Sequence, residues 1–253
     1  MDLCDRDVPI HPYFNTMAKM LFLLTVFFIP ASGMSVDVNH MSDQELVDYL
    51  NTNQHFFKAE VPTMSYEKCS GGYGIRAFQY GMTYGVCTGG AYNAKNCCKP
   101  HPFHPCGQHK GQPYYGDCLK NNEDTPSCRA QCQFGYNMDY NRDKIYANSA
   151  YQVYASEDAI RKEIFTNGPV QATFTAYSDL MYYKNGVYVR TWGKSEGGHV
   201  IKIIGWDVEN GVKYWLVSNS WSSDWGDNGL FKIRRGTNEC NIEAYVNAVI
   251  MNA

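Results

Sequence analysis

Alternating apolar and polar positions dominate the second half of the chain and predict β-strands there. Runs rich in β-branched and aromatic residues are separated by turns that contain glycine. These runs are Val170–Thr175, Val187–Val189, Val200–Ile204, Lys213–Val217 and Leu230–Ile233. Asn210-Gly211, between two of the runs, is a strong signal for a two-residue hairpin turn. The C-terminal half is therefore predicted to form an antiparallel, barrel-like lobe.

A short helix is predicted over residues 42–50. Ser42, followed three residues later by Glu45, has the pattern of a capping box, in which the two side chains satisfy free backbone N–H groups. Val47 and Leu50 then fall on one face of the helix. The Phe-Phe-Lys run that follows carries no clear signal by itself.

A second helix is predicted over residues 156–165. Ser156 is a typical N-cap, acidic residues occupy the first turn, and Gly168 marks the end of the helix. Residues 69–132 are rich in Gly, Pro, Tyr and Cys, a composition typical of loops held by disulfides. One short helix is expected within this stretch, after Gly72.

The composition is that of a folded chain. Its 253 residues and 28.7 kDa suffice for one large domain or two lobes. Hydrophobic residues make up 44% and charged residues 19%, which argues against long disordered stretches. The net charge of -3 offers no basic surplus for a phosphate backbone, so nucleic-acid binding is disfavoured.

Cysteine usage is the most informative part of the composition. The chain has ten cysteines, and eight of them lie between Cys69 and Cys132. This density indicates a disulfide framework formed in an oxidising compartment, with a zinc site as the alternative. The side chains that could hold zinc are Cys97, Cys98, Cys128, Cys132, His101, His104 and His109. Their spacing follows no regular zinc finger or ribbon, so disulfides are favoured and no metal is expected.

A secretory signal is predicted near the N-terminus. Residues 17–33 combine a lysine, the apolar run Leu21–Ile29 and small residues at the end. The apolar run is far shorter than the ~20 residues that span a bilayer, and a buried helix or strand is the alternative interpretation. Residues 1–16 precede this signal as an upstream extension. Removal of the chain through Gly33 leaves an odd number of cysteines, so at least one thiol would lack an intramolecular partner.

Two stretches could carry chemistry. His199 follows Gly197-Gly198 at the start of a strand, and Asn219 ends another strand beside Trp221 and Trp225. An asparagine oxygen can fix the tautomer of an imidazole, so that the second ring nitrogen faces a nucleophile. Indole rings around this hydrogen bond would exclude water and strengthen it. The structural alternative is a buried histidine and a turn asparagine among core aromatics, but the pairing favours a catalytic site.

With these residues the chain resembles the papain-like cysteine peptidases, and within them the cathepsin B-like branch. The resemblance runs almost continuously from Cys69 to Met251. Its markers are Cys69-Ser-Gly-Gly-Tyr73, Gly89-Gly90, Cys106 to Cys118, Asp124-Thr125-Pro126-Ser-Cys128, Cys132 with Gly135-Tyr136, Asn167-Gly168-Pro169-Val170, Gly198-His199, Asn219-Ser220-Trp221 and Trp225-Gly226. Residues 41–59 are also similar to the start of the cathepsin B propeptide.

The resemblance implies an α+β fold of the papain-like, two-lobed kind. The C-terminal antiparallel β-barrel lobe is retained, and the N-terminal helical lobe is largely deleted. The implied organisation is an upstream extension, a signal peptide, a propeptide remnant and a truncated papain-like peptidase domain. Their boundaries are 1–16, 17–33, 34–60 and 61–253.

The resemblance also implies roles for the site residues. His199 is the general base and partner of a thiolate, and Asn219 orients His199. Trp221, with Trp225, shields the pair. Gly72 and Gly198 belong to the substrate-binding cleft, where the backbone of Gly72 pairs with an extended peptide by strand addition.

The nucleophile that this mechanism needs is missing from the sequence. The family carries it in Cys-Gly-Ser-Cys-Trp at the start of a helix, with an upstream glutamine for the oxyanion hole, and this motif does not occur here. The propeptide-like segment ends near Ala59, and the family resemblance resumes at Cys69. Cys69 could be considered as a substitute, but its context matches a structural disulfide cysteine of the family. The chain is therefore predicted to be catalytically inactive.

Two further positions bear on the substrate. The loop from Cys106 to Cys118 matches the occluding loop, where two adjacent histidines hold the C-terminal carboxylate of a substrate. Only His109 is kept, so this capture should be weaker, and an exposed loop histidine is the alternative. Tyr245 stands where cathepsin B has an acidic residue. It should therefore favour an apolar or aromatic side chain at the second residue before the scissile bond.

The resemblance implies part of the cysteine pairing. Cys98 should pair with Cys132, and Cys106 with Cys118. Cys69 and Cys128 match cysteines whose partners lie in the missing region, and Cys240 matches a free cysteine. Cys87 and Cys97 have no assignment, although Cys87 could pair with one of the cysteines left without a partner.

The sequence therefore predicts a member of the cathepsin B-like cysteine peptidase family that lacks its nucleophile. A non-catalytic protein that binds peptides or inhibitors is the second hypothesis, and a disulfide-stabilised structural domain is the third. Expected partners are protein or peptide substrates and cystatin-like inhibitors, without a cofactor, nucleic acid or membrane span. The expected location is the secretory pathway, either extracellular or lysosomal.

Overall fold

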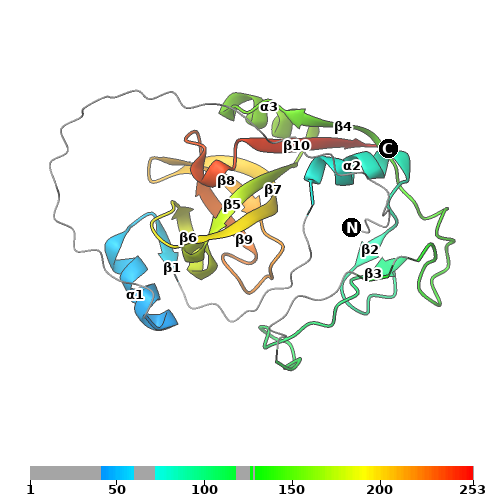
Figure 1. Ribbon diagram of the computed structural model, residues 1–253, viewed down its shortest axis with the longest axis horizontal. Helices are drawn as coiled ribbons and strands as arrows, with labels where there is room; N and C mark the ends of the chain where they lie inside the picture. Colours follow the sequence, from blue (N-terminus) through cyan, green and yellow to red (C-terminus); the bar gives the residue numbers. More distant parts are fainter. Residues whose placement is uncertain (1–40, 60–71, 118–125, 128, 253) are drawn as a thin grey trace, which may run out of the picture.

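An eight-stranded sheet forms the centre of the protein (Figure 1). The computed structural model describes residues 41–59, 72–117, 126–127 and 129–252. The predicted signal peptide and Cys69, Cys118 and Cys128 lie outside these residues.

The strands of the large sheet follow the order β1-β6-β9-β8-β7-β5-β10-β4, and the fold is α+β as predicted. The elements in chain order are α1 (Asp43–Asn53), β1 (Phe57–Ala59), α2 (Gly74–Thr83), β2 (Gly89–Gly90), β3 (Lys99–Pro100), β4 (Ala147–Val153), α3 (Glu157–Asn167), β5 (Val170–Tyr177), η2 (Ser178–Tyr182), β6 (Tyr183–Tyr188), β7 (Ser195–Glu209), β8 (Val212–Ser218), β9 (Leu230–Arg234), η3 (Glu239–Asn241) and β10 (Tyr245–Met251).

The predicted strand runs all lie within strands of this sheet or directly beside one. β5 shows the expected alternation, with every second residue from Val170 onward buried. The hairpin between β7 and β8 turns at Asn210 and Gly211, whose φ angles are 51° and 81°. Positive φ at both central residues is what a type I′ turn requires, so the hairpin prediction is confirmed.

The lobe is antiparallel, as predicted, except at one pair of strands. β6 and β9 run parallel, with Val187 opposite Lys232 and Tyr188 opposite Ile233. Parallel neighbours need a long crossover connection, and here the β7–β8 hairpin lies between the two strands in the sequence. Local alternation of side chains cannot reveal the direction of such a distant pairing.

Helix α1 and strand β1 close one edge of the sheet. The predicted capping box is present, because Ser42 accepts from Glu45 N and the Glu45 carboxylate accepts from Ser42 N. Asn51 then binds the backbone of Ala59 at both its N–H and its carbonyl. β1 pairs antiparallel with β6, and the ring of Phe57 is only 5% exposed. The helix and strand therefore belong to the same folded unit as the sheet.

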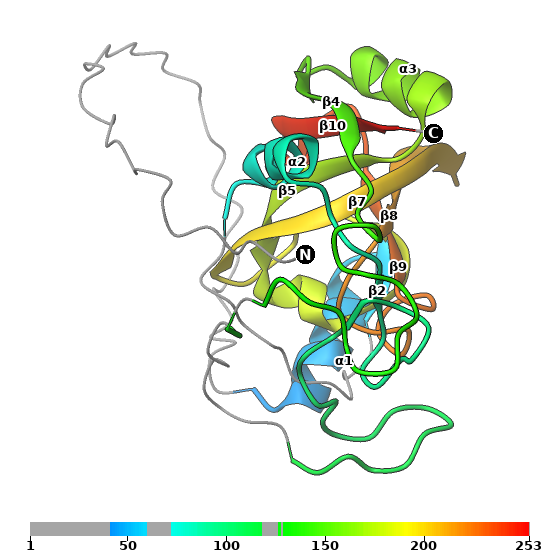
Figure 2. The same cartoon turned by 90° about the vertical axis from the view of Figure 1, so that its right-hand side faces the viewer.

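The other two α-helices lie near the opposite edge of the sheet, beside β4 and β10 (Figure 2). α3 begins at the predicted N-cap, where Ser156 accepts from Ala159 N, and it ends at Gly168 with φ 98°. α2 approaches β5 so closely that a Cβ on Gly74 would lie 2.0 Å from Oε1 of Gln171. That carboxamide oxygen also accepts from Nδ2 of Asn247 on β10, so the glycine permits the helix to dock at this point.

One hydrophobic core joins these elements. Trp215, Phe174 and Phe231 lie at its centre and are almost completely buried, and Leu50 of α1 belongs to the same cluster. Full burial of one such side chain contributes about 1.5–3 kcal/mol, so the core provides the rigid support on which the candidate site rests. No helix within the described residues is long and apolar enough to cross a bilayer.

Candidate active site

His199 and Asn219 are brought together by neighbouring strands. His199 lies on β7 opposite Phe174 of β5, and Asn219 directly follows β8. Because β7 and β8 pair antiparallel, the two residues meet at one end of the sheet. Nε2 of His199 lies 2.9 Å from Oδ1 of Asn219. This bond places the proton on Nε2, so Nδ1 is the nitrogen that can accept a proton.

Aromatic rings pack against the imidazole of His199. The indole of Trp221 stacks on it with centroids 5.2 Å apart, and the ring of Phe174 lies at 5.8 Å. Trp225 packs against Trp221 and is itself fixed by a bond from Nε1 to the carbonyl of Met181. Burial lowers the pKa of His199 below its ordinary value, and the hydrogen bond to Asn219 opposes this by favouring the charged ring. The site therefore holds a neutral imidazole that can act as a base near neutral pH.

The loop after β8 holds Asn219 in place. Its N–H donates to the carbonyl of Gly229, and its Oδ1 also accepts from Ser220 N at 2.8 Å. Gly226 has φ 60°, and a Cβ there would lie 2.6 Å from the carbonyl oxygen of Leu230. Nδ2 of Asn219 is buried and has no hydrogen-bond partner among the described residues. The amide is thus oriented from one side only.

No cysteine among the described residues completes this pair. Cys98, Cys106 and Cys132 are in disulfides, and Cys240 is a thiol whose pKa is raised by burial to about 12. None of the described cysteines forms a hydrogen bond with His199, whose recorded polar partner is Asn219. Cys69 lies outside the described residues. The described part of the site therefore contains a base and its orienting amide.

Comparison with known proteins identifies the family. The family described as papain family cysteine protease matches residues 30–250. This chain belongs to the papain family of cysteine proteases. Cathepsin B-like cysteine proteinase 1 of Ostertagia ostertagi is 46% identical over 175 residues, which cover 69% of this chain and 51% of that protein. Cathepsin B-like cysteine proteinase 3 of the same organism is also 46% identical over 175 residues, and these residues cover all of it.

A solved structure extends the resemblance to the fold. ProCathepsin B S9 from Trypanosoma congolense shares 34% identity with a TM-score of 0.56, over 70% of this chain and 52% of that one. Cathepsin B-like cysteine proteinase 4 of Caenorhabditis elegans is 48% identical over 176 residues, which cover 69% of this chain and 52% of that protein. The papain-family chain thus spans about half the length of several of its cathepsin B-like relatives.

Tyr245 lies at the end of a row that crosses three strands of the sheet. Tyr245 on β10 pairs with Thr173 on β5, and Thr173 pairs with Val200 on β7. Residues paired in this way project from the same face of the sheet. Tyr245 is 62% exposed and Val200 42% exposed, and Val200 directly follows His199. The row is therefore an exposed, largely apolar surface next to His199 in the sheet. Of its three residues, the sequence indicated a role for Tyr245 alone.

His109 is held against the loop that carries Trp221. Its Nδ1 lies 3.0 Å from Oδ2 of Asp224, and its Nε2 lies 2.9 Å from the carbonyl oxygen of Cys106. The N–H of Lys110 donates to the same oxygen of Asp224 at 3.2 Å. Both ring nitrogens therefore lie within hydrogen-bond distance of oxygen atoms. Sequence analysis missed Asp224, because it is distant in the sequence from the loop it anchors.

Gly72 and Gly198 are both exposed. A Cβ on Gly198 would meet no atom within 4 Å, so an extended chain could approach its backbone. Gly72 lies just before α2, and no hydrogen bond within the described residues connects it to His199 or Asn219. The structure thus groups Gly198 with the histidine but records no such link for Gly72.

The cysteine-rich region forms the disulfide Cys98–Cys132. Cys106 is also in a disulfide, and its expected partner Cys118 lies outside the described residues. One group of side chains of metal-ligand type occurs among the described residues, namely Cys87, Cys98 and Asp143. Because Cys98 is bonded to Cys132, it cannot offer a thiolate there. The histidines considered for zinc, His101, His104 and His109, do not belong to this group.

Proposed function

We propose that this chain is a catalytically inactive member of the cathepsin B-like branch that retains the base half of the active site. The observation that carries the proposal is the pair of His199 and Asn219, joined at 2.9 Å, whose free ring nitrogen faces no described cysteine. The absence of Cys-Gly-Ser-Cys-Trp from the sequence supports the same conclusion. The chain keeps the proton acceptor but lacks the atom that attacks the peptide bond.

The chemistry explains why the remaining residues do not suffice. Peptide cleavage in this family uses a thiolate that forms a covalent acyl-enzyme, and the imidazole only activates it and later donates a proton. Oxyanion donors supply a further large part of the rate, about 2.7–4 kcal/mol for one donor. A lone oriented imidazole offers neither the covalent step nor this stabilisation. We therefore expect no measurable hydrolysis of peptides.

The buried amide of Asn219 supports a missing packing partner at this site. Nδ2 lacks an acceptor within the described residues, and a buried unsatisfied donor costs about 1–3 kcal/mol. A complete papain-like site would contain a second wall opposite the histidine. The unpaired Nδ2 is consistent with the loss of that wall together with the nucleophile.

The sheet surface beside His199 is suited to bind an extended peptide without cleaving it. The row of Tyr245, Thr173 and Val200 offers an apolar or aromatic contact beside the histidine. We therefore propose that Tyr245 favours an apolar or aromatic side chain at the peptide residue that, in a substrate of the family, is the second before the scissile bond. Tyr245→Glu should shift this preference towards arginine, measured by the binding of labelled peptides that differ only at this residue. An unchanged preference would remove Tyr245 from the peptide site.

The contacts of His109 argue against capture of a C-terminal carboxylate. Its two ring nitrogens already face Asp224 and the carbonyl of Cys106, so a substrate carboxylate would have to replace one of them. We therefore propose that His109 captures a C-terminal carboxylate only weakly. Peptides with free and amidated C-termini should bind equally well.

A thiol-directed peptidase probe tests the inactivity directly. The full chain should not be labelled in a way that depends on His199, whereas an active cathepsin B-like relative should be labelled in the same assay. Cys69→Ser and His199→Ala provide the matched variants, because Cys69 is the remaining candidate for a nucleophile. Labelling that is lost in both variants would show a working Cys69–His199 pair and would overturn the proposal.

Genomic sequence between the codons for Ala59 and Cys69 tests whether the missing segment is absent from the gene or only from this chain. Exons that encode Cys-Gly-Ser-Cys-Trp would show that a full peptidase gene exists and that this chain is a shortened product. Uninterrupted coding in many transcripts would favour the second function, a non-catalytic protein that binds peptides or cystatin-like inhibitors. The exposed rim of the site, with Gly198 and Val200, is the surface available for such binding.

We propose that the chain enters the secretory pathway. The signal-like residues 17–33 and the disulfide Cys98–Cys132 support this location, because such bonds persist in oxidising compartments. Expression in animal cells should give protein in the medium or in acidic vesicles. Retention in the cytosol with reduced thiols would contradict the proposal.

A further inference from the structure

The two edge strands of the large sheet differ in how their outer backbone groups are used. β1 and β4 stand at opposite ends of the strand order, and each pairs with one neighbour (Figure 1). An edge strand presents a row of N–H and C=O groups that can pair with another chain. We propose that β4 pairs antiparallel with β4 of a second copy of this chain, so that two copies form a symmetric dimer.

Side chains of α1 close the edge at β1. Asn51 accepts from Ala59 N at 2.8 Å and donates to the carbonyl of Ala59 at 3.0 Å. Gln54 binds the N–H and the carbonyl of Phe57 in the same way, at 3.0 Å and 2.6 Å. An incoming strand would have to displace these carboxamides, so β1 is a poor partner for another chain.

The edge at β4 has no comparable cover within the described residues. Ser149 to Val153 pair with β10 in an unbroken register, and the shift in register comes before Ser149. Among the described residues, no hydrogen bond other than those to β10 is recorded for the backbone of this stretch. One side of the strand therefore keeps its N–H and C=O groups available for pairing.

α2 and α3 lie against the two faces of the sheet near β4 rather than along its edge. α2 packs against Gln171, which stands in one row with Asn247 and Gln152. Residues paired in such a row project from the same face. Tyr151, the neighbour of Gln152, projects from the other face and donates to Glu163 of α3 at 2.6 Å. A second strand could therefore approach β4 in the plane of the sheet.

The sequence of β4 lacks the usual protection of an edge strand. Residues 145–156 contain no charged residue and no proline. Natural edge strands often carry lysine or proline, which prevent pairing with other chains. Two copies of this stretch can therefore pair without placing like charges opposite each other.

The residues that flank this uncharged stretch favour a second copy as the partner. Arg142 is exposed just before it, whereas the neighbouring Asp143 is buried. Asp158, just after it, keeps 85% of its side chain exposed, although it pairs with Arg161. Antiparallel pairing of two copies brings the basic end of each strand beside the acidic end of the other. The flanking charges thus attract each other across the two-fold axis.

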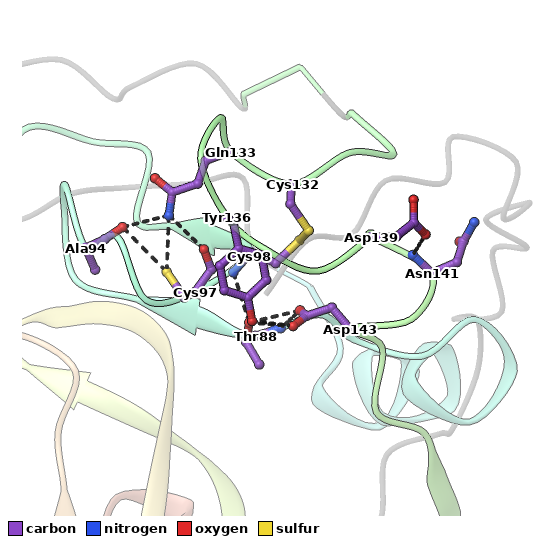
Figure 3. The surroundings of a disulfide bond; sticks show 10 residues. All are labelled: Thr88, Ala94, Cys97, Cys98, Cys132, Gln133, Tyr136, Asp139, Asn141 and Asp143. Atoms are coloured by element: carbon purple, nitrogen blue, oxygen red, sulfur yellow. Dashed lines mark hydrogen bonds between the residues drawn. A yellow bond between two sulfur atoms is a disulfide. The ribbon is translucent and has the colours of Figure 1, made fainter.

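Both ends of β4 are anchored, so its edge is already formed in the single chain. Before the strand, Asp143 accepts from Thr88 N and from the hydroxyl of Tyr136, at 2.7 Å each (Figure 3). After the strand, Ser156 accepts from Ala159 N and caps α3. A preformed edge loses little conformational freedom when a second strand binds.

The pairing should end at two copies. A two-fold interface uses the same surface on both chains, and the edge at β1 is closed by α1. The dimer therefore has no second open edge through which it could grow into a filament. Pairing of one short strand buries a small area, so the dimer should dissociate on dilution.

Sedimentation equilibrium of the full chain over a range of concentrations tests the assembly. We expect a monomer that gives way to a dimer, without larger species, as the concentration rises. Backbone amides in residues 145–155 should exchange hydrogen more slowly over the same range, whereas those of β8 should not change. A monomer at all concentrations, growth into filaments, or a dimer in which the exchange of β4 is unchanged would overturn the proposal.

Lysines on β4 identify the contact. Asn148→Lys combined with Gln152→Lys places like charges on both paired strands and should raise the dissociation constant about tenfold. Val208→Lys combined with Thr237→Lys is the matched control, because both positions are exposed outside β4. Equal effects of the two pairs would contradict the inference.

An oppositely charged partner makes the test independent of stability. Asn148→Glu combined with Gln152→Glu, mixed in equimolar amounts with the lysine pair, should form more dimer than either protein alone. A mixture that associates no better than its components would count against pairing through β4. The concentration dependence of hydrogen exchange in the wild type decides the question even if a variant fails to fold.

Discussion

At the scale of single residues, the candidate site depends on how one imidazole is held. The imidazole of His199 contacts the rings of Trp221 and Phe174 and bonds to Asn219, and this bond fixes its tautomer. Burial favours the neutral ring, and the asparagine bond favours the charged ring. The net effect is a lowered pKa, which means that burial outweighs the hydrogen bond.

This balance makes stability depend on pH in a predictable direction. The pKa of His199 is lowered from 6.5 in the folded chain, so the unfolded chain binds more protons as the pH falls through 6.5. The free energy of unfolding should therefore be larger at pH 7 than at pH 5. Urea unfolding at a series of pH values measures this change.

The variant His199→Gln isolates the contribution of this residue. Glutamine cannot take up a proton in this range, so the difference in unfolding free energy between wild type and variant should shrink or change sign towards pH 5. Other titrating groups are the same in both proteins and cancel in the difference. A difference that does not vary with pH would contradict the lowered pKa.

At the scale of elements, the helix and strand at the N-terminal edge are as well packed as the sheet itself. The ring of Phe57 contacts those of Tyr183 and Tyr188, with centroids 6.0 Å and 5.2 Å away. Gly186 has φ 89°, and a Cβ there would lie 2.7 Å from the carbonyl oxygen of Phe56, so β6 accommodates β1 closely. Such packing is expected of an integral part of the folded chain.

Phe57→Ala should destabilise the whole protein. Truncation of a buried phenylalanine typically costs about 3–5 kcal/mol, because a cavity replaces the ring. Urea unfolding followed by tryptophan fluorescence measures the loss. Lys58→Ala is the matched control, because the adjacent side chain is exposed and such substitutions usually change stability by about 0.5 kcal/mol or less. Equal effects of the two variants would show that β1 does not share the core.

The contact between His109 and Asp224 should restrain the loop around His109. Asp224→Ala removes the acceptor for both the imidazole and the N–H of Lys110. Backbone amides in residues 106–117 should then exchange hydrogen faster, as measured by mass spectrometry. Lys110→Ala is the control, because Lys110 contributes only its backbone N–H to this contact. Unchanged exchange in Asp224→Ala would mean that other contacts hold the loop.

Local patterns explain which elements could be predicted from the sequence. α1 and α3 were identified by their caps, and β5 by its alternation, because these signals arise from nearby residues. β4 and β10 were missed, since small and polar residues interrupt their apolar patterns. The pairing of β6 with β9 and the contact of His109 with Asp224 join distant segments, and no local pattern records them.

For the candidate site too, the sequence predicted the residues with a recognisable local context and missed those that depend on strand pairing. His199 and Asn219 were recognised from their glycine- and tryptophan-rich contexts, which resemble those of the papain-like family. The row that includes Thr173 and Val200 was not recognised, because it depends on the register between three strands. Register follows from the pairing of side chains across the whole sheet, so it becomes visible only in the folded chain.

At the scale of the whole molecule, the chain combines a well-formed sheet with the paired side chains of His199 and Asn219. One hydrophobic core extends from Val47 to Ala248 and includes Phe174, whose ring contacts His199. Near this pair, Val200 and Tyr245 are exposed, and Nδ2 of Asn219 is buried without a hydrogen-bond partner among the described residues. We propose that the other lobe of a complete papain-like fold would cover these groups. This arrangement fits the proposal of a catalytic half that lacks its nucleophile.

Restoring the missing segment should restore reactivity. A chain with a family segment inserted between Ala59 and Cys69, carrying Cys-Gly-Ser-Cys-Trp and its upstream glutamine, should react with a thiol-directed peptidase probe. The helix start would lower the pKa of the new cysteine, and Nδ1 of His199 would receive its proton. The inserted wall would also offer an acceptor to Nδ2 of Asn219.

The matched variants of the restored chain make this prediction specific. His199→Ala should abolish labelling, because it removes the base, and Asn219→Ala should reduce it, because the ring is no longer held in the productive tautomer. Replacement of the inserted cysteine by serine gives the blank. A restored chain that unfolds cooperatively but is not labelled would mean that the surviving half is no longer arranged for catalysis. Labelling that persists without His199 would instead show a cysteine that reacts independently of the His199–Asn219 pair.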